Sequence, residues 1–238
     1  MILELHFRSS ADFKIEKVNE KFSSVIYKIL SSTTFQDIHD KSHTPFIFSP
    51  FRPFLKDGRF EKNRVYKIEF RSPNFELLKE VQNRIEQKSF IELDYNRLYH
   101  HESRTRREPQ NISKVKTVTP IVLSISERLA EKHGIIKKHS STYWTPEMSF
   151  QIFVEAMNRS MVKKWNFWNP DNLYPEDIEV ITGYQLLKNY PIAVPYKKGK
   201  VLGSLWELQF DGELNEIVRF NYLSGFGGKS GGGFGYVI

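Results

Sequence analysis

Apolar and polar residues in the first part of the chain are spaced in a way that predicts a strand, a helix and a further extended segment in turn. Residues 2–8 alternate as a strand with one buried face does. Apolar residues from Phe22 to Leu30 then recur with the spacing of an amphipathic helix, which we expect over about residues 18–32. The segment 46–54 follows, and its aromatic residues between prolines favour an extended conformation.

The pattern that follows predicts a second strand, helix and strand. Residues 65–70 alternate as a strand, and Ser72–Pro73 has the residues of a helix start. Apolar residues such as Leu77 and Val81 lie on one side of this helix, and residues 90–95 return to the strand pattern. The predicted order is β-α-β-β-α-β, which is the split βαβ arrangement of ferredoxin-like folds.

The second half of the chain has a similar order of elements. An alternating run at 115–125 predicts its first strand, and Thr145–Pro146 has the N-cap and first-turn residues of a helix. Two strands and a weakly defined helical segment are expected near 178–187, 204–210 and 213–222. No sequence repeat links the two halves, so the inferred duplication rests on the order of elements alone.

These elements predict an α+β protein with two tandem ferredoxin-like domains, the βαββαβ architecture that is also called RRM-like. The first domain is expected at residues 1–102 and the second at residues 116–238. Residues 103–115 are charged and lack periodicity, which is typical of a linker. A glycine-rich loop at 225–235 is expected to lead into the last strand of the second domain.

The chain ends in GFGGKSGGGFGYVI, residues 225–238, where seven of the first eleven positions are glycine. A flexible tail is one interpretation, but the apolar residues around the glycines favour an ordered loop whose backbone approaches a ligand closely. The spacing of the glycines excludes a P-loop and a dinucleotide-binding fingerprint. Residues 233–237 match part of the aromatic strand motif of RNA-recognition domains.

Composition narrows the class of partner. The 238 residues include 35 Lys and Arg against 28 Asp and Glu, which gives a net charge of +7 and an isoelectric point near 9.3. This balance favours nucleic acid as the partner. The chain has no cysteine, which excludes disulfides and thiolate metal sites and fits a reducing compartment. No apolar run has the length of a membrane span and no signal peptide is recognisable, so we expect a cytoplasmic protein without membrane association.

The glycine-rich end carries a resemblance to a known family. Two tandem ferredoxin-like units that end in G-F-G-x-K-x-x-x-G-F-G closely resemble the CRISPR-associated endoribonucleases that process repeat RNA, the sixth Cas family of the RAMP superfamily. The motif occupies residues 225–235, with weaker agreements at 25–29, 37–40 and 117–121. Within this resemblance the glycines let the backbone approach RNA phosphates, and Lys229 adds a positive charge.

The resemblance implies RNA cleavage without a metal ion or any other cofactor. A ribose 2′-hydroxyl attacks the adjacent phosphate, leaving a 2′,3′-cyclic phosphate and a 5′-hydroxyl, and a histidine, a tyrosine and a lysine often assist. His39 matches the histidine, and Tyr27 lies about 130° from the centre of the helix's apolar stripe, which would point it away from the core. The lysine position falls near Thr44. Either Lys41 or His43 could supply charge there, or both could be ordinary solvated loop residues.

Residues expected to contact RNA come from the glycine loop and from basic clusters. In the loop they are Gly225, Gly227, Gly228, Lys229, Ser230, Gly231, Gly233 and Gly235. Elsewhere they are Arg52, Arg104, Arg106, Arg107, Lys137 and Lys138. The partner implied by the resemblance is CRISPR repeat RNA in its precursor transcript. Other Cas proteins of an effector complex and a second copy of this chain, forming a homodimer, are further candidate partners.

Two other functions fit the same sequence. The departure at the lysine position fits a paralogue that binds repeat RNA without cleaving it. An unrelated pair of RNA-recognition domains from messenger or ribosomal metabolism would bind RNA without a preference for repeats. Cleavage of repeat RNA in EDTA, together with resistance of an RNA that carries a 2′-deoxy substitution at the cut site, would distinguish the enzyme from both.

Overall fold

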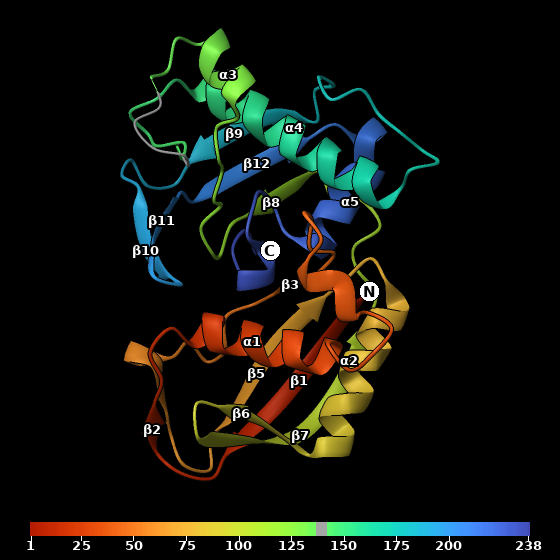
Figure 1. Ribbon diagram of the computed structural model, residues 1–238, viewed down its shortest axis with the longest axis vertical. Helices are drawn as coiled ribbons and strands as arrows, with labels where there is room; N and C mark the ends of the chain where they lie inside the picture. Colours follow the sequence, from red (N-terminus) through yellow and green to blue (C-terminus); the bar gives the residue numbers. More distant parts are fainter. Residues whose placement is uncertain (137–141) are drawn as a thin grey trace. The chain divides into compact units, whose positions relative to one another are not determined.

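The computed structural model describes residues 1–136 and 142–238 (Figure 1). The chain forms two compact units. Unit 1 contains Met1–Glu108 and Gly231–Gly233, and unit 2 contains Pro109–Ser230 and Phe234–Ile238. Over the described ranges, no helix combines the length and the apolar character that crossing a bilayer requires.

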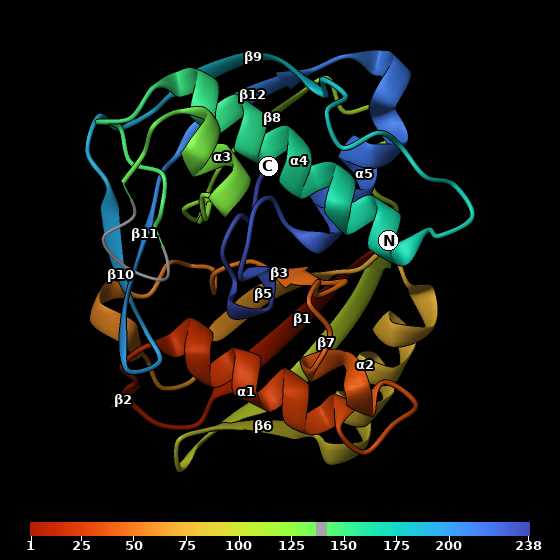
Figure 2. The same cartoon turned by 45° about the horizontal axis from the view of Figure 1, so that its top comes forward.

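Unit 1 is built on a five-stranded antiparallel sheet with two helices against one face (Figures 1 and 2). In the order in which they lie, its strands are β3 (Ile47–Phe48), β5 (Val65–Arg71), β1 (Ile2–Ser9), β7 (Asn96–Arg106) and β6 (Phe90–Leu93). The helices are α1 (Val18–Leu30) and α2 (Phe75–Lys88). The smaller elements are β2 (Phe13–Lys14), which pairs with β4 (Arg59–Phe60), and the 3-10 turns η1 (Gln36–His39) and η2 (Lys56–Gly58).

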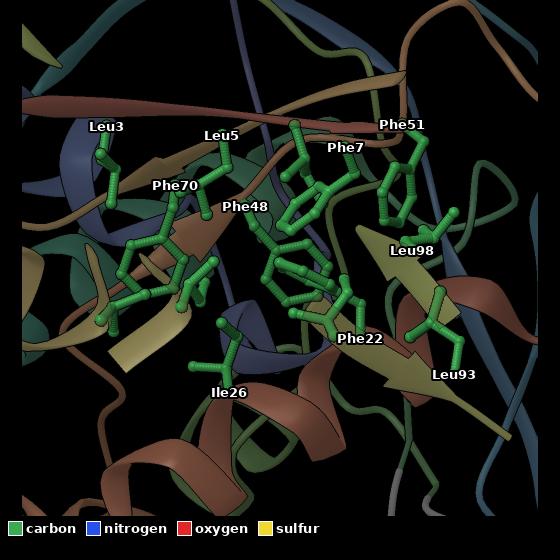
Figure 3. Packing of buried hydrophobic residues seen from close by; sticks show 14 of the residues in the cluster. Leu3, Leu5, Phe7, Phe22, Ile26, Phe48, Phe51, Phe70, Leu93 and Leu98 are labelled. Carbon is green, nitrogen blue, oxygen red and sulfur yellow. The ribbon is translucent and has the colours of Figure 1, made fainter. Parts of the chain in front are cut away.

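The alternation predicted for the first strand places one face of β1 in the core. Leu3, Leu5 and Phe7 are fully buried and pack in one cluster with Phe22 and Ile26 of α1 (Figure 3). Burying each large apolar side chain stabilises the fold by about 1.5–3 kcal/mol. The period-two pattern of the strand and the helical pattern of α1 therefore meet in the same core.

The second helix of unit 1 begins later than the sequence suggested. Its N-cap is Asn74, whose side chain accepts a hydrogen bond of 3.1 Å from the backbone N–H of Leu77. Ser72 is buried instead, and its hydroxyl donates to the carbonyl of Pro45 at 2.7 Å. The predicted start at Ser72–Pro73 is corrected by two residues because the hydroxyl of Ser72 serves the preceding loop.

The edge of the sheet next to β1 also differs from the prediction. Residues 90–95 were expected to be the last strand, but 90–93 form the outer β6, and β7 is the strand that pairs with β1. Because β7 pairs Arg106 with Ile2, residues 103–106 of the expected linker belong to this sheet. The order of the strands is that of a ferredoxin-like fold with one added outer strand.

Unit 2 contains a three-stranded antiparallel sheet with the order β8 (Lys114–Lys116), β12 (Trp206–Phe210) and β9 (Ile181–Leu186). The C-terminal segment extends this sheet beside β8, because Lys116 and Ile238 exchange backbone hydrogen bonds of 2.8 and 2.9 Å. The helices and turns of this unit are α3 (Glu127–Lys132), α4 (Phe150–Trp168), α5 (Asn215–Ser224), η3 (Gly212–Leu214) and η4 (Ser230–Gly232). A separate hairpin consists of β10 (Ile192–Tyr196) and β11 (Gly199–Gly203).

Three predictions for the second half change in detail. The helix expected at Thr145–Pro146 is α4, which begins after its N-cap Ser149, since residues 145–148 form a turn instead. Only the first residues of the expected strand 115–125 lie in β8, and isolated bridges follow. The weak helical pattern at 213–222 corresponds to α5, while the sequence analysis did not foresee α3 or the β10–β11 hairpin.

Candidate functional site

Three polar side chains follow one another at four-residue spacing along α1, next to its apolar stripe. They are Asn19, Ser23 and Tyr27. The glycine segment Gly231–Gly233 packs against this line within unit 1. The hydroxyl of Ser23 donates to the carbonyl oxygen of Gly231 at 2.6 Å. Residues that are about two hundred positions apart in the chain are therefore brought together at one helix.

The close approach at this helix explains two of the glycines. A Cβ atom on Gly231 would overlap the hydroxyl of Tyr27 and lie 3.2 Å from Oγ1 of Thr44. A Cβ atom on Gly233 would lie 2.8 Å from the ring of Phe48, and the backbone φ of +83° there disfavours any other residue. The segment can lie against α1 only with bare main chain at these positions.

Tyr27 is half-buried at this contact. Its ring lies against those of Phe46 and His39, with centroid distances of 5.6 and 4.9 Å, and its hydroxyl lies 3.3 Å from Oγ1 of Thr44. Burial raises the pKa of the Tyr27 hydroxyl, although the hydrogen bond with Thr44 opposes this shift. Tyr27 was predicted to point away from the core; that prediction is wrong in part, because residues 39–46 cover this side of the helix.

His39 is the last residue of η1, which is anchored by the buried Ile38. Its side chain is 65% exposed, and its ring meets the ring of Tyr27 edge to face at an angle of 80°. Nδ1 lies 3.5 Å from the carboxylate of Asp40. The imidazole is thus held beside Tyr27 while remaining open to a ligand.

The loop that leads from η1 to β3 carries the other two predicted catalytic residues. Lys41 is exposed and His43 is half-buried. Thr44, where the resemblance would place a lysine, makes the contact with the Tyr27 hydroxyl. The structure therefore brings His39 and Tyr27 into contact and leaves a hydroxyl at the expected lysine position.

A buried lysine that sequence analysis missed holds the start of the glycine loop in unit 2. Nζ of Lys164, on α4, donates to the carbonyl oxygens of Ser224, Gly225 and Gly227 at 3.4, 2.5 and 3.3 Å. Burial lowers the pKa of Lys164 from 10.5 to about 7. The sequence signal was its position three residues after the buried Met161, on the apolar side of α4.

Most of the glycine loop is buried rather than open to a ligand. Gly228 and Lys229 are exposed, whereas the other positions from Gly225 to Gly235 are buried. The N–H groups of Gly228 and Gly235 donate to backbone carbonyls at 2.8 and 2.9 Å, so these two amides are already used within the protein, and RNA contact at these two glycines stays a prediction. RNA contact at Gly225, Gly227, Ser230, Gly231 and Gly233 stays a prediction.

Lys229 lies beside an aromatic side chain that sequence analysis did not single out. Its Nζ is 5.2 Å from the centroid of the Tyr196 ring, on the β10–β11 hairpin, and Nζ of Lys197 is 5.9 Å from the same ring. Phe234, just beyond the glycines, meets this ring at 5.5 Å. The loop and the hairpin together present positive charge around one tyrosine.

The predicted arginines occupy different surroundings. The side chain of Arg104 pairs with Glu102 at 2.7 Å, and Arg106 pairs with both Glu4 and Glu69 at 3.1 Å. Arg52 is half-buried with its guanidinium 5.8 Å from the ring of Phe54, and Arg107 is exposed. Lys137 and Lys138 lie outside the described residues. RNA contact at the described arginines stays a prediction, and part of the charge of Arg104 and Arg106 is already balanced by acids.

Metal-binding groups do not cluster in the part of the chain that the structure describes. No group of three or more His, Asp or Glu side chains there is arranged as a metal site. The candidate catalytic groups that the structure brings together are the imidazole of His39, the phenol of Tyr27 and the polar residues of the loop from 40 to 44.

Comparison with known proteins identifies the family. The family model described as CRISPR associated protein Cas6, C-terminal, matches residues 102–238. A CRISPR-associated endoribonuclease Cas6 of Haloferax mediterranei is 26% identical over 258 residues, covering 99% of this chain and 92% of the relative. Two solved structures, described as an RAMP protein binding different RNA substrates and as CRISPR associated protein Cas6, have TM-scores of 0.76 and 0.75. Each is 18% identical to this chain, and the similarity covers 100% of this chain and 98% of the solved chain. The resemblance predicted from the glycine motif is confirmed: the chain belongs to the Cas6 family of CRISPR-associated proteins.

Proposed function

We propose that this protein is an endoribonuclease that binds CRISPR repeat RNA and cleaves the precursor transcript within the repeat. The observation that carries the proposal is the contact of His39 and Tyr27 beside the glycine segment at Gly231, in a chain of the Cas6 family. The names of two similar proteins support it, since one is called an endoribonuclease and the other is described as binding RNA substrates.

The proposed reaction uses the RNA's own 2′-hydroxyl and no metal ion. The 2′-oxygen gives its proton to a base and forms a bond to the adjacent phosphorus, while the bond from phosphorus to the 5′-oxygen breaks and that oxygen takes up a proton. The products are a 2′,3′-cyclic phosphate and a 5′-hydroxyl. Such a reaction needs a proton acceptor, a proton donor and hydrogen-bond donors for the phosphate oxygens.

We assign His39 and Tyr27 different roles in this reaction, and their surroundings support the assignment. The exposed imidazole of His39 is accessible to RNA and acts as the proton acceptor. Because burial raises its pKa, the hydroxyl of Tyr27 keeps its proton at neutral pH and acts as a hydrogen-bond donor to the phosphate. Lys41 and His43 lie on the adjoining loop, where positive charge would stabilise the pentavalent transition state.

RNA would be attracted to the protein by its positive charge. The net charge of +7 favours association with a polyanion. Lys229 and Lys197 flank the Tyr196 ring, and the exposed Lys198 and Lys200 lie on the same hairpin. Phosphate contacts at such lysines position an RNA without reading its sequence.

A second candidate function is a repeat-RNA-binding protein that does not cleave. The observation in its favour is Thr44, which occupies the place at Tyr27 where the resemblance suggests a lysine. A hydroxyl supplies no positive charge to the transition state, so a protein that relied on that lysine would bind RNA and leave it intact.

The test compares two RNAs and three proteins. Repeat RNA from the protein's own CRISPR locus is incubated in EDTA, alongside the same RNA with a 2′-deoxy substitution at the cut site. We expect the first RNA to be cleaved and the second to stay intact. His39→Ala should slow cleavage about 100- to 10,000-fold, as the loss of a general base does. His101→Ala, which changes an exposed histidine outside the site, is the matched control.

RNA affinity, measured by gel shift, separates the two candidate functions. A shifted band with no product from the unaltered protein favours the non-cleaving candidate. Equal loss of binding and cleavage in His39→Ala would contradict the catalytic role of His39, because an exposed proton acceptor should affect the chemical step far more than binding.

A further inference from the structure

Unit 1 has a surface pocket that the proposed reaction does not use. The pocket has a volume of about 480 Å³ and is formed by the β2–β4 pair and the loop that precedes β4. Lys14, on the strand β2 that Figure 1 labels, is one of the residues that line it. The ring of Phe54 is 66% exposed in its wall. An aromatic ring that is left open to solvent inside a polar pocket is a surface on which a planar group can stack.

The charges around this pocket are not balanced within the protein. Lys14 on β2 is the direct cross-strand neighbour of Arg59 on β4. Like charges in this position repel and destabilise the strand pair. Lys56 also lines the pocket, and over residues 1–136 and 142–238 none of these three cations has an ion-pair partner. A bound anion would relieve this repulsion.

Acidic residues at the pocket offset only part of this charge. Four cationic and two acidic side chains line it. Glu61 is paired with Arg64 at 2.8 Å, which leaves Asp57 as the second acid. The excess is positive, so the pocket favours a ligand with negative charge next to a flat apolar group.

The pocket is held in shape by backbone contacts on both sides. The backbone N–H of Ile15 donates to the carbonyl of Gly58 at 3.0 Å, and a Cβ on Gly58 would overlap the carbonyl of Ile15. Arg52 and Lys67 exchange two backbone hydrogen bonds of 2.7 Å. Opposite Lys14 and Arg59, the rings of Phe13 and Phe60 stack at 4.8 Å on the buried side of the ribbon. Such a preformed site loses little conformational entropy on binding.

We propose that this pocket binds an unpaired nucleotide of the RNA, with its base stacked on Phe54 and its phosphates near Lys14, Lys56 and Arg59. A base offers its flat face only when it is unpaired, which selects a single-stranded segment over a duplex. The assignment of RNA as the ligand rests on the proposed function. The pocket adds to that function a second point of contact, on the β2–β4 pair, for a strand whose cut site lies at His39.

The test measures the affinity of the full chain for two fluorescein-labelled RNAs: the repeat RNA, and an oligo(A) RNA of about 12 nucleotides, which is within the range of single-strand sites. Phe54→Ala should weaken binding about five- to a hundredfold, the effect of removing one base stack. Phe54→Trp should restore it. Phe75→Ala removes another exposed phenylalanine of unit 1, on α2, and should leave the affinity unchanged.

The positive charge of the pocket is tested separately, by the salt dependence of RNA binding and by the melting temperature. Arg59→Gln should weaken RNA binding and reduce the slope of log K against log salt by about 0.7, the value for one phosphate contact to a single strand. The same substitution should raise the melting temperature, because it removes the repulsion with Lys14. A fall in melting temperature together with unchanged affinity would show that Arg59 has only a structural role and would overturn the proposal.

Abasic RNAs locate the stacked base. In a series of repeat RNAs that each carry one abasic site, the effect of Phe54→Ala should disappear for one position and persist for the others.

The affinities for repeat RNA and oligo(A) RNA separate the possible failures. If the unaltered protein binds both of these RNAs and Phe54→Ala binds them with the same affinity, the pocket proposal fails while the proposed function stands. If the unaltered protein binds neither RNA, both fail. Binding to phosphatidylserine vesicles that is lost in Phe54→Ala, without a change in RNA affinity, would assign the pocket to a membrane instead and also overturn the proposal.

Discussion

Replacing Lys164 tests how the start of the glycine loop is held. The side chain is 2% exposed, and its ammonium group donates to three backbone carbonyls of residues 224–227. An ammonium has three N–H donors, whereas a neutral amine has two and so leaves one of these carbonyls without its partner. Lys164→Met keeps an unbranched chain of similar length and removes the titrating group.

The pKa of Lys164 determines how stability depends on pH. Burial lowers this pKa from 10.5 to about 7, so between these values the unfolded chain binds more protons than the folded one. The free energy of unfolding of the unaltered protein should therefore rise with pH across this window, by up to about 1.4 kcal/mol per pH unit. Below about pH 7 both states are protonated and this contribution to the pH dependence vanishes. Lys164→Met lacks it at every pH.

Urea unfolding followed by tryptophan fluorescence measures the difference. All four tryptophans lie in unit 2, at positions 144, 165, 168 and 206, so the signal reports on the unit that contains Lys164. From pH 7.5 to 9.0, the unaltered protein should gain about 2 kcal/mol relative to Lys164→Met. Lys163→Met, a substitution of the exposed neighbour on the same helix, should show the pH dependence of the unaltered protein.

One result would refute this reasoning. If the unaltered protein and Lys164→Met have the same pH dependence between pH 7.5 and 9.0, Lys164 keeps its proton throughout. The three carbonyls would then hold the charged form strongly enough to offset its desolvation, and the loop would be anchored by a permanent charge.

Three further substitutions test the site and the loop. Tyr27→Phe should slow cleavage about 100- to 1000-fold in single-turnover assays with unchanged RNA affinity, as the loss of one transition-state donor does; a rate within about twofold of the original would exclude this role. Gly235→Ala should destabilise unit 2 in urea unfolding by more than about 1 kcal/mol, because φ is +75° and the new Cβ would overlap the carbonyl of Phe226. Gly228→Ala, where a Cβ would make only a 3.5 Å contact, should be much milder; equal effects would contradict the packing argument.

Elements with one clearly apolar face were predictable from the sequence. β1 and α1 each bury a regular set of side chains, and both were expected close to their observed bounds. β7 was not predicted as a strand, because all of its side chains except Leu98 are exposed or half-buried and it lacks a regular apolar face, and residues 103–106 were assigned to a linker. Its hydrogen bonds to β1, rather than its side chains, define it as a strand.

The candidate site was predictable only in part. His39 and Tyr27 came from a resemblance of local motifs, and their contact follows from η1 lying beside α1. The packing of Gly231 on α1 joins segments that are remote in sequence, which no local pattern can indicate. The burial of Lys164 was not predicted, because it follows the exposed Lys163 and a pair of lysines usually indicates a solvated surface.

Most glycines of the C-terminal motif are buried and allow the loop to pack closely within the protein. Side chains hold the loop through its carbonyls at two places, Lys164 at Gly225 and Gly227, and Ser23 at Gly231. Within unit 2, Lys164 therefore holds the backbone that leads to the exposed Lys229. If Lys229 contacts RNA as predicted, a substitution at a buried glycine of unit 2 would weaken that contact by displacing Lys229, even where the glycine itself touches no phosphate. The comparison of Gly235→Ala with Gly228→Ala decides between this packing explanation and direct contact of the glycine backbone with phosphate. Only the packing explanation requires the loss of RNA affinity to follow the loss of stability.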